Sequence, residues 1–281
     1  MSKARELASL GNAYSDGALS NRNKIINGSF TVAQRGTSGG ATSSYAYTLD
    51  RWLANGAITS WSQTGSQKNV LQVVTQAGTG IAQRIESNGA NFVSGNTYTL
   101  SFKVNPTIAD VEIGITFRNG SSYLSNVVGV TDVSSQVTAG SYSTVTYTFT
   151  LPDTADITTY PSHNMQVYIG SSVVNTLNLM EVQLEVGDTA TPFEHRSYGQ
   201  ELALCQRYYR RGFSIYNEDG NNGAIAMFGS EMRSNPTATR TGIAITSAEN
   251  VPSTVATTIQ RIYIYNATLP TGGVYNLDAE L

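Results

Sequence analysis

Residues 97–104 are TYTLSFKV, a run in which large apolar side chains alternate with threonine, serine and lysine. Alternation with a period of two puts one set of side chains on each face of a strand, so it predicts a half-buried antiparallel strand. Residues 144–151, TVTYTFTL, repeat the pattern, and shorter runs of it occur at 111–117, 167–169 and 180–186. Several short strands with turn-forming clusters between them predict an all-β fold, a jelly-roll β-sandwich.

One interior segment has a helical pattern instead. In residues 199–211, Leu202, Cys205 and Tyr209 recur at helical spacing. Strand-like runs resume beyond it, at 224–228, 239–245, 259–266 and 274–277. We therefore expect four parts: an N-terminal anchor and linker (1–22), a sandwich (23–197), a linking helix (198–211) and a small C-terminal β module (212–281).

The N-terminal segment predicts a short helix over residues 2–10, with Ser2 as its N-cap and Leu7 and Leu10 on one side. A helix of nine residues is not stable alone. Two explanations remain: the helix docks on another protein or on copies of itself, or it is a frayed terminus. Docking is the favoured one, because it gives Leu7 and Leu10 a partner and makes them the anchor.

Composition excludes several classes of protein. Only 13% of residues are charged, whereas Ser, Thr, Asn and Gly make up 111 of 281. The net charge of −3, with no run of Lys or Arg, argues against nucleic acid as a partner. No apolar stretch has the length of a membrane span or a signal peptide, so we expect no membrane insertion. The single cysteine, Cys205, excludes an intrachain disulfide.

Titratable groups suited to catalysis are few. His163 and His195 are the only histidines, and both lie in polar stretches where a solvated or structural role is expected. Cys205 lies on the apolar side of the predicted helix and is expected to be a small buried residue. No phosphate-binding loop, zinc-protease motif or calcium loop is present in the sequence. We expect a protein that is not an enzyme, with no cofactor, no metal and no catalytic residue.

Sugar binding does not need the titratable groups that catalysis needs. Tyr and Trp rings can stack on sugars, and Asn, Thr and Ser can hydrogen-bond to hydroxyls. Four aromatic residues near the start of the sandwich are candidates: Tyr45, Tyr47, Trp52 and Trp61. Core packing is the alternative for the tryptophans and the favoured one for Trp52, whereas Tyr45 and Tyr47 contact either sugar or nothing.

Three early stretches are distinctive: residues 23–30 (NKIINGSF), 34–36 (QRG) and 47–52 (YTLDRW). They resemble the opening of a jelly-roll, carbohydrate-binding-like domain common in structural and fibre proteins of tailed phages. Later stretches are similar to the junction and C-terminal pattern of that group: 183–187 (QLEVG), 190–196 (ATPFEHR), 201–209 (ELALCQRYY), 231–237 (EMRSNPT) and 278–281 (DAEL).

The resemblance implies a virion protein, usually a homotrimer, that is assembled in the host bacterial cytoplasm. Its partners would be copies of itself, other virion proteins through the N-terminal segment, and bacterial surface polysaccharide. The short N-terminal segment favours a compact attachment or decoration piece over a long shaft, and we expect a short tail fibre or tail appendage for host attachment. The alternatives are a capsid decoration or head fibre protein with a purely structural role and, as a weaker option, a polysaccharide depolymerase.

Three arginines, Arg207, Arg210 and Arg211, lie close together near the end of the predicted helix. They could form a receptor site for acidic sugars, or they could pair with carboxylates such as Glu194 and Glu201 and lock the junction. The structural role is favoured, because the helix lies between two β regions that need a rigid joint.

Overall fold

The structure is a computed structural model that describes residues 22–66, 68–86, 92–119, 122–152, 163–214, 223–233, 237–240, 243–244, 248–249, 259–265 and 274–280. Residues 2–10 lie outside these ranges, and with them the predicted helix and its Leu7 and Leu10. No helix in the described ranges is long and apolar enough to span a membrane.

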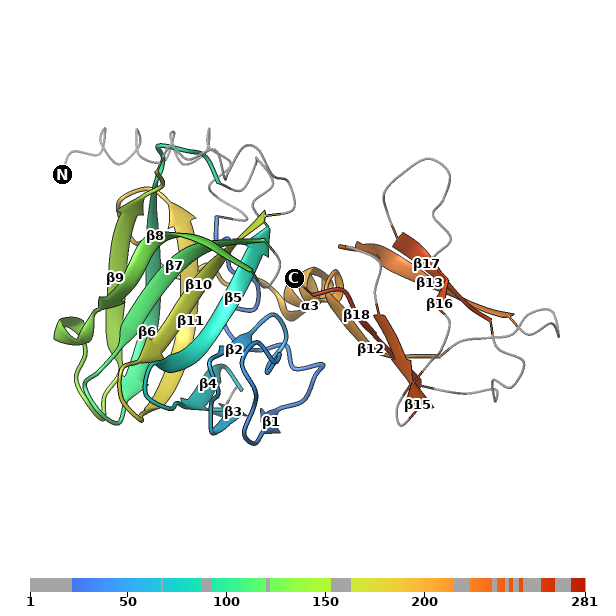
Figure 1. Cartoon of the computed structure of the whole chain (residues 1–281), viewed down its shortest axis with the longest axis horizontal. Coiled ribbons are helices and arrows are strands. Elements are labelled where there is room, and N and C mark those ends of the chain that lie inside the picture. Colours follow the sequence, from blue (N-terminus) through green and yellow to red (C-terminus); the bar gives the residue numbers. More distant parts are fainter. Residues whose placement is uncertain are drawn as a thin grey trace.

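Two antiparallel sheets form the sandwich seen on the left of Figure 1. The six-stranded sheet has the order β1 (Ser38–Gly39), β3 (Ser60–Thr64), β4 (Val70–Val74), β11 (Thr176–Val186), β6 (Thr97–Pro106) and β9 (Ser143–Thr150). The five-stranded sheet has the order β2 (Leu53–Asn55), β5 (Thr79–Glu86), β10 (His163–Ser171), β7 (Glu112–Asn119) and β8 (Ser122–Asp132). A short 3-10 helix, η1 (Ser134–Gln136), precedes β9.

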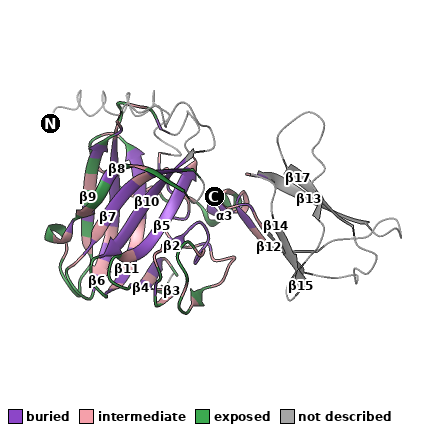
Figure 2. Ribbon diagram, in the orientation of Figure 1, coloured by how far each residue is buried: buried purple, intermediate pink, exposed green. Residues whose placement is uncertain are grey.

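The chain passes from one sheet to the other between β4, β5, β6 and β7, and again between β9, β10 and β11. This alternation is a jelly-roll topology, so the predicted all-β sandwich is confirmed. The alternating apolar residues of 97–104 and 144–151 face inward and form a core with those of β7 and β10. In Figure 2 buried residues run along the strands of the sandwich.

The predicted linking helix begins where expected but is shorter. Helix α3 (Tyr198–Gln206) starts at a capping box, in which the Gln200 amide donates to Ser197 Oγ and the Ser197 amide donates to Gln200 Oε1. Its end at Gln206 corrects the prediction of a helix to residue 211. The next residues turn, and β12 (Tyr209–Ser214) pairs with β18 (Val274–Asp278), so long-range strand pairing prevails over the local helical pattern.

The C-terminal region contains two further sheets, and Figure 1 shows α3 between them and the sandwich. One has the order β12, β18, β14 (Thr237–Arg240) and β15 (Ile243–Ala244). The other has the order β13 (Gly223–Met232), β17 (Ile259–Tyr265) and β16 (Ala248–Glu249). Strands therefore occur at all four predicted C-terminal runs, and the division into an anchor, a sandwich, a linker and a module stays a prediction.

Candidate functional site

The outer face of the five-stranded sheet carries an unusual set of polar side chains. Because Met165, Val167 and Ile169 of β10 point into the core, the residues between them point outward. Strand register aligns these outward residues with those of β5 and β7 in three rows: Glu86–Asn164–Arg118, Arg84–Gln166–Thr116 and Ala82–Tyr168–Gly114. We call these nine residues, together with Tyr45 and Tyr47, the polar face.

Several polar atoms on the polar face have no hydrogen-bond partner within the part of the chain that the structure describes. Asn164 is fully buried, yet neither its Oδ1 nor its Nδ2 is paired. The hydroxyls of Thr116 and Tyr168 are unpaired as well. Leaving a buried polar group unsatisfied costs about 1–3 kcal/mol, so such groups are rare unless a ligand or water completes them. Four such atoms, on three side chains of one sheet face, make this face the candidate binding site.

Gln166 lies at the centre of the polar face with its side chain fixed in orientation. Its Oε1 accepts from Arg84 Nε at 3.2 Å, and its Nε2 donates to Asn55 Oδ1 at 3.3 Å. These two contacts link the edge strand β2 to β5 through a residue of β10. These hydrogen bonds therefore fix the centre of the polar face without a ligand.

Tyr45 lies over one end of the polar face, between two arginines. The Cζ atoms of Arg84 and Arg118 are each 5.1 Å from the Tyr45 ring centroid, and Arg118 Nη2 donates to the Tyr45 hydroxyl oxygen at 3.1 Å. The Tyr45 side chain remains 39% exposed. Its ring is thus oriented by two cations and still accessible from solvent.

The backbone at Tyr45 is strained. Its φ of 65° is in the left-handed region, which costs a non-glycine residue about 1–3 kcal/mol. Two backbone hydrogen bonds hold this turn, from the Tyr45 amide to Ala54 O at 2.7 Å and from the Ala54 amide to Ala46 O at 2.8 Å. Strain of this kind persists where the surrounding structure fixes the residue, often at binding sites.

Tyr47 and Tyr168 form an apolar strip beside the polar rows. Tyr168 packs with Leu53 and Ala82, and the half-buried Tyr47 packs against them. The Tyr168 ring lies along its strand over Gly170, where an added β-carbon would come within 2.0 Å of the hydroxyl oxygen. Burial raises the pKa of Tyr168, and the charges of Glu112 and Asp110 raise it further. Tyr168 is therefore a neutral hydroxyl at physiological pH.

The two tryptophans do not reach this site. Trp52 is fully buried, packs against Phe30 at 5.1 Å between ring centroids, and donates from Nε1 to Asn27 O at 3.0 Å. Trp61 is buried against Gly39, at a point where a β-carbon would clash with its ring. Because a sugar cannot stack on a buried ring, the prediction of Trp52 and Trp61 as sugar contacts is wrong. Tyr45 and Tyr47 do lie at the polar face.

Most of the polar face was not predicted from the sequence. Asn164, Gln166 and Tyr168 do alternate with core residues in NMQVYIG (164–170), so their outward direction follows from the period-two pattern. Arg84 and Arg118 lie 34 residues apart in the sequence. Only the register of β5, β10 and β7 brings them together.

A second polar cluster joins the sandwich to the C-terminal module. Arg51, 1% exposed, pairs with Glu280 through Nη1, and its Cζ lies 3.4 Å from the Tyr208 ring centroid. Arg35 Nη2 is 3.0 Å from Asp278 Oδ2 and 3.4 Å from Glu280 Oε1. The C-terminal residues are thus held to the sandwich by buried charges.

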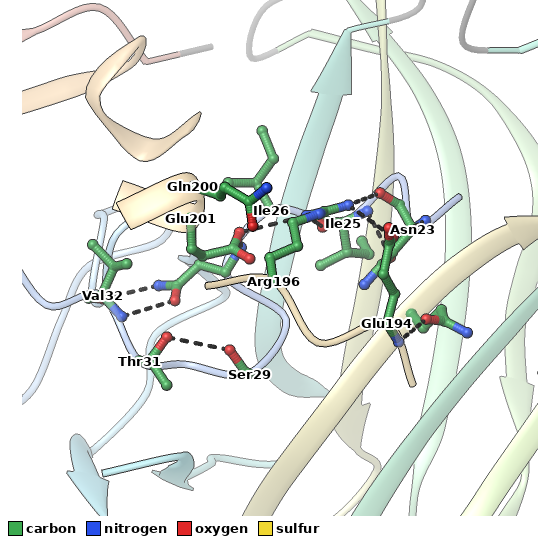
Figure 3. Close-up of polar contacts among 12 residues, drawn as sticks. Asn23, Ile25, Ile26, Ser29, Thr31, Val32, Glu194, Arg196, Gln200 and Glu201 are labelled. Atoms are coloured by element: carbon green, nitrogen blue, oxygen red, sulfur yellow. Dashed lines mark hydrogen bonds and ion pairs between the residues drawn. The ribbon is translucent and has the colours of Figure 1, made fainter. Parts of the chain in front are cut away.

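Figure 3 shows the neighbouring part of this junction, where Arg196 lies between Glu201 on one side and Asn23 and Glu194 on the other. Arg196 donates from Nη2 to Asn23 O and from Nη1 to Ile25 O, the latter at 3.0 Å. Burial raises the pKa of the Glu201 carboxyl, although the Asn27 amide and the Arg196 charge oppose this. Arg196 therefore fixes the start of α3 against residues 23–25.

The predicted arginine cluster has other partners than expected. Arg207 pairs with Glu86 at 3.7 Å, whereas Glu194 and Glu201 pair with Arg196. Arg210 Nε donates to Gln206 O at 3.1 Å, and Arg211 Nη1 donates to Gln34 O at 3.1 Å. The expected pairing of these arginines with Glu194 and Glu201 is wrong, since β12 begins at Tyr209 and redirects the chain.

The other residues considered as catalytic or metal-binding candidates do not form a cluster in the part of the chain that the structure describes. Cys205 is buried, and burial raises the pKa of its thiol. His195 is exposed and packs edge-on against Phe193, with ring centroids 5.0 Å apart, while the side chain of His163 is outside the described part. Among the residues described, no group of three or more His, Cys, Asp or Glu is placed to hold a metal ion.

No protein-family model matches the chain, and no curated protein matches it. Among solved structures, it is similar to the CBM22-1 xylan-binding domain of Paenibacillus barcinonensis Xyn10C, with 16% identity, 53% of this chain and 94% of that chain covered, and a TM-score of 0.35. A CBM4 structure matches with 17% identity, coverage of 58% and 99%, and a TM-score of 0.37.

A third solved structure is tailspike protein 4 of bacteriophage CBA120, with 12% identity, coverage of 59% and 21%, and a TM-score of 0.37. All three likenesses are distant. The sheet order described above defines the fold without them.

Proposed function

We propose that the chain binds glycan, with the sugar held on the polar face. The Tyr45 side chain carries this proposal, because it is 39% exposed and lies between Arg84 and Arg118 at the end of the polar face that contains the buried, unpaired Asn164 amide. Thr116 adds a hydroxyl to the same surface, and Tyr45 offers a ring for stacking. Tyr123 of β8, opposite Arg118 in register, adds a second exposed ring.

The chemistry of this surface supports binding more than catalysis. Its outward groups are amides, hydroxyls, rings and guanidinium groups, and Glu86, the carboxylate in its three rows, contacts Arg207 and the Tyr208 hydroxyl at the junction. Binding that rests on a few rings and hydroxyls is weak, with Kd in the micromolar to millimolar range. We propose that the protein retains polysaccharide without shortening it.

We further propose that the protein is a component of a tailed-phage particle, as a short tail fibre or tail appendage. The sequence resemblance supports this, and the resembling stretches converge in space: Asn23, Arg35, Arg51, Arg196, Tyr208 and Glu280 all belong to the junction. We also propose that the protein is a homotrimer, as the resemblance implies. Light scattering on the full chain should then give three times the mass of one chain. A monomer at micromolar concentration would contradict the trimer.

Replacing Tyr45 by alanine tests the glycan site. We expect retention on host envelope polysaccharide to weaken about five- to thirtyfold, since loss of one stacking ring removes on the order of 1–2 kcal/mol. Tyr142→Ala is the matched control, because Tyr142 is 47% exposed and precedes β9 of the other sheet. Equal retention of the two variants would contradict the site, and shortened polysaccharide chains would contradict a purely binding role.

A further inference from the structure

Tyr45 lies on a hairpin that the sheet holds by one arm. The hairpin comprises residues 45–54, and the hydrogen bond from the Tyr45 amide to Ala54 O at 2.7 Å joins its two arms. Its second arm runs into β2, an edge strand of three residues whose sheet partner is β5. A two-stranded hairpin is only marginally stable alone, so the position of the first arm depends on what the hairpin packs against.

Residues near the C-terminal end of the chain contact both the tip and the first arm of this hairpin. Glu280, whose side chain is 4% exposed, pairs through Oε2 with Arg51 at the tip and through Oε1 with Arg35 at 3.4 Å. The Cζ of Arg35 is 4.8 Å from the ring centroid of Tyr47 on the first arm and 3.9 Å from that of Tyr209 in β12. One buried carboxylate thus holds two cations that contact the hairpin at two points.

The two guanidinium groups depend on this carboxylate to different degrees. Among the residues that the structure describes, Glu280 is the carboxylate that pairs with Arg51, whereas Arg35 also pairs with Asp278 at 3.0 Å. Without the negative charge of Glu280, two buried positive charges would lie close together and repel each other. The backbone at Arg51 is also strained, with a φ of 69°, and such strain persists only where neighbouring contacts fix the residue.

The charge of Glu280 also acts on the first arm. Burial raises the pKa of Tyr47, and the charge of Glu280 raises it further. Leu49 and Trp52, on either side of the tip, are fully buried and belong to the core of the sandwich. Because these two side chains keep the hairpin folded, loss of the Glu280 charge is expected to shift the first arm, with Tyr45, rather than to unfold the sandwich.

We propose that Glu280 is a positioning residue for glycan binding: through Arg51 and Arg35 it holds the hairpin where the Tyr45 ring meets the sugar. This inference rests on the proposed glycan-binding function. Glu280 follows β18 by two residues, so the affinity for glycan depends on the docking of β18 against the sandwich. A partner that displaces the C-terminal strands would then weaken glycan binding, and by linkage bound glycan would oppose that displacement.

Glu280→Gln tests this role, with Glu185→Gln as the matched control. Glu185 is also a buried carboxylate, but it lies on β11 and accepts hydrogen bonds from Thr191. We expect Glu280→Gln to weaken retention on host envelope polysaccharide about three- to tenfold, as is typical of residues that act through their neighbours, and Glu185→Gln to leave it unchanged. Glu280→Asp keeps the charge, so it should lose less retention, and it serves where the glutamine variant does not fold.

Amide chemical shifts of the full chain, measured without sugar, show whether the first arm moves. We expect Glu280→Gln to shift the amides of residues 45–47 and Glu185→Gln to leave them in place. Unmoved amides, retention equal to that of the native protein, or an equal loss in both glutamine variants would overturn the positioning role. Weakened retention in Tyr45→Ala would still support the glycan-binding function in each of those cases. No retention by the native protein would overturn that function, and this inference with it.

Discussion

Replacement of Arg51 by methionine is expected to lower the free energy of unfolding by about 3–5 kcal/mol, because it breaks a buried ion pair and leaves the Glu280 carboxylate with the more distant Arg35 as its cation. Arg51 is 1% exposed and forms an ion pair with Glu280, whose side chain is also buried. The same guanidinium donates from Nη2 to Arg84 O and covers the Tyr208 ring at 3.4 Å. Without it, Arg35 at 3.4 Å is the cation that remains beside Glu280.

Denaturant unfolding followed by tryptophan fluorescence would measure this loss. Arg22→Met is the control, since Arg22 is partly exposed and 3.9 Å from Glu185, a pair expected to contribute less than 1 kcal/mol. The double variant Arg51→Met with Glu280→Gln should recover part of the loss, because it removes the stranded charge. A loss below 1 kcal/mol in Arg51→Met alone would contradict a buried charged junction.

Replacement of Trp52 by alanine is expected to cost about 3–5 kcal/mol, as is typical when a large core side chain is deleted. Trp52 is fully buried, packs on Phe30, and anchors Asn27 through its indole N–H. Trp52→Phe should cost less, because it keeps the ring packing and loses only the hydrogen bond and part of the volume. Thermal and denaturant unfolding of both variants would measure the difference.

This result also separates the core from the site. Trp52→Ala should cost more stability than Tyr45→Ala, which removes a partly exposed ring and one hydrogen bond from Arg118, and only Tyr45→Ala should weaken glycan retention. A fully stable Trp52→Ala variant that had lost glycan binding would contradict the core role of Trp52 and favour a sugar contact instead.

The fold could be predicted from the sequence because strand alternation is local. Residues 97–104 and 144–151 carry their inward and outward faces in eight residues each, and the structure uses both as strands. The end of α3 could not be predicted in this way. The helical spacing continues to Tyr209, but Tyr209 pairs with Asp278, 69 residues further along the chain, and that contact has no local signal.

The site could be predicted only in part, for the same physical reason. Tyr45 and Tyr47 were found because exposed aromatic residues in a Ser-rich loop are suited to ligand contact. For Trp52, five residues after Tyr47, core packing is the favoured interpretation from the sequence, and the structure confirms it. Arg84, Thr116 and Asn164 belong to three strands, and their meeting depends on register rather than on any motif.

The most direct test of the glycan-binding polar face is to locate a bound sugar by NMR chemical-shift mapping on the full chain, with fragments of host envelope polysaccharide as the ligand. We predict that the largest shifts occur in the amides of residues 44–46, 114–118 and 164–168, from the Tyr45 turn, β7 and β10. Shifts confined to the outer face of β6 and β9, or to the strands beyond β12, would contradict the account.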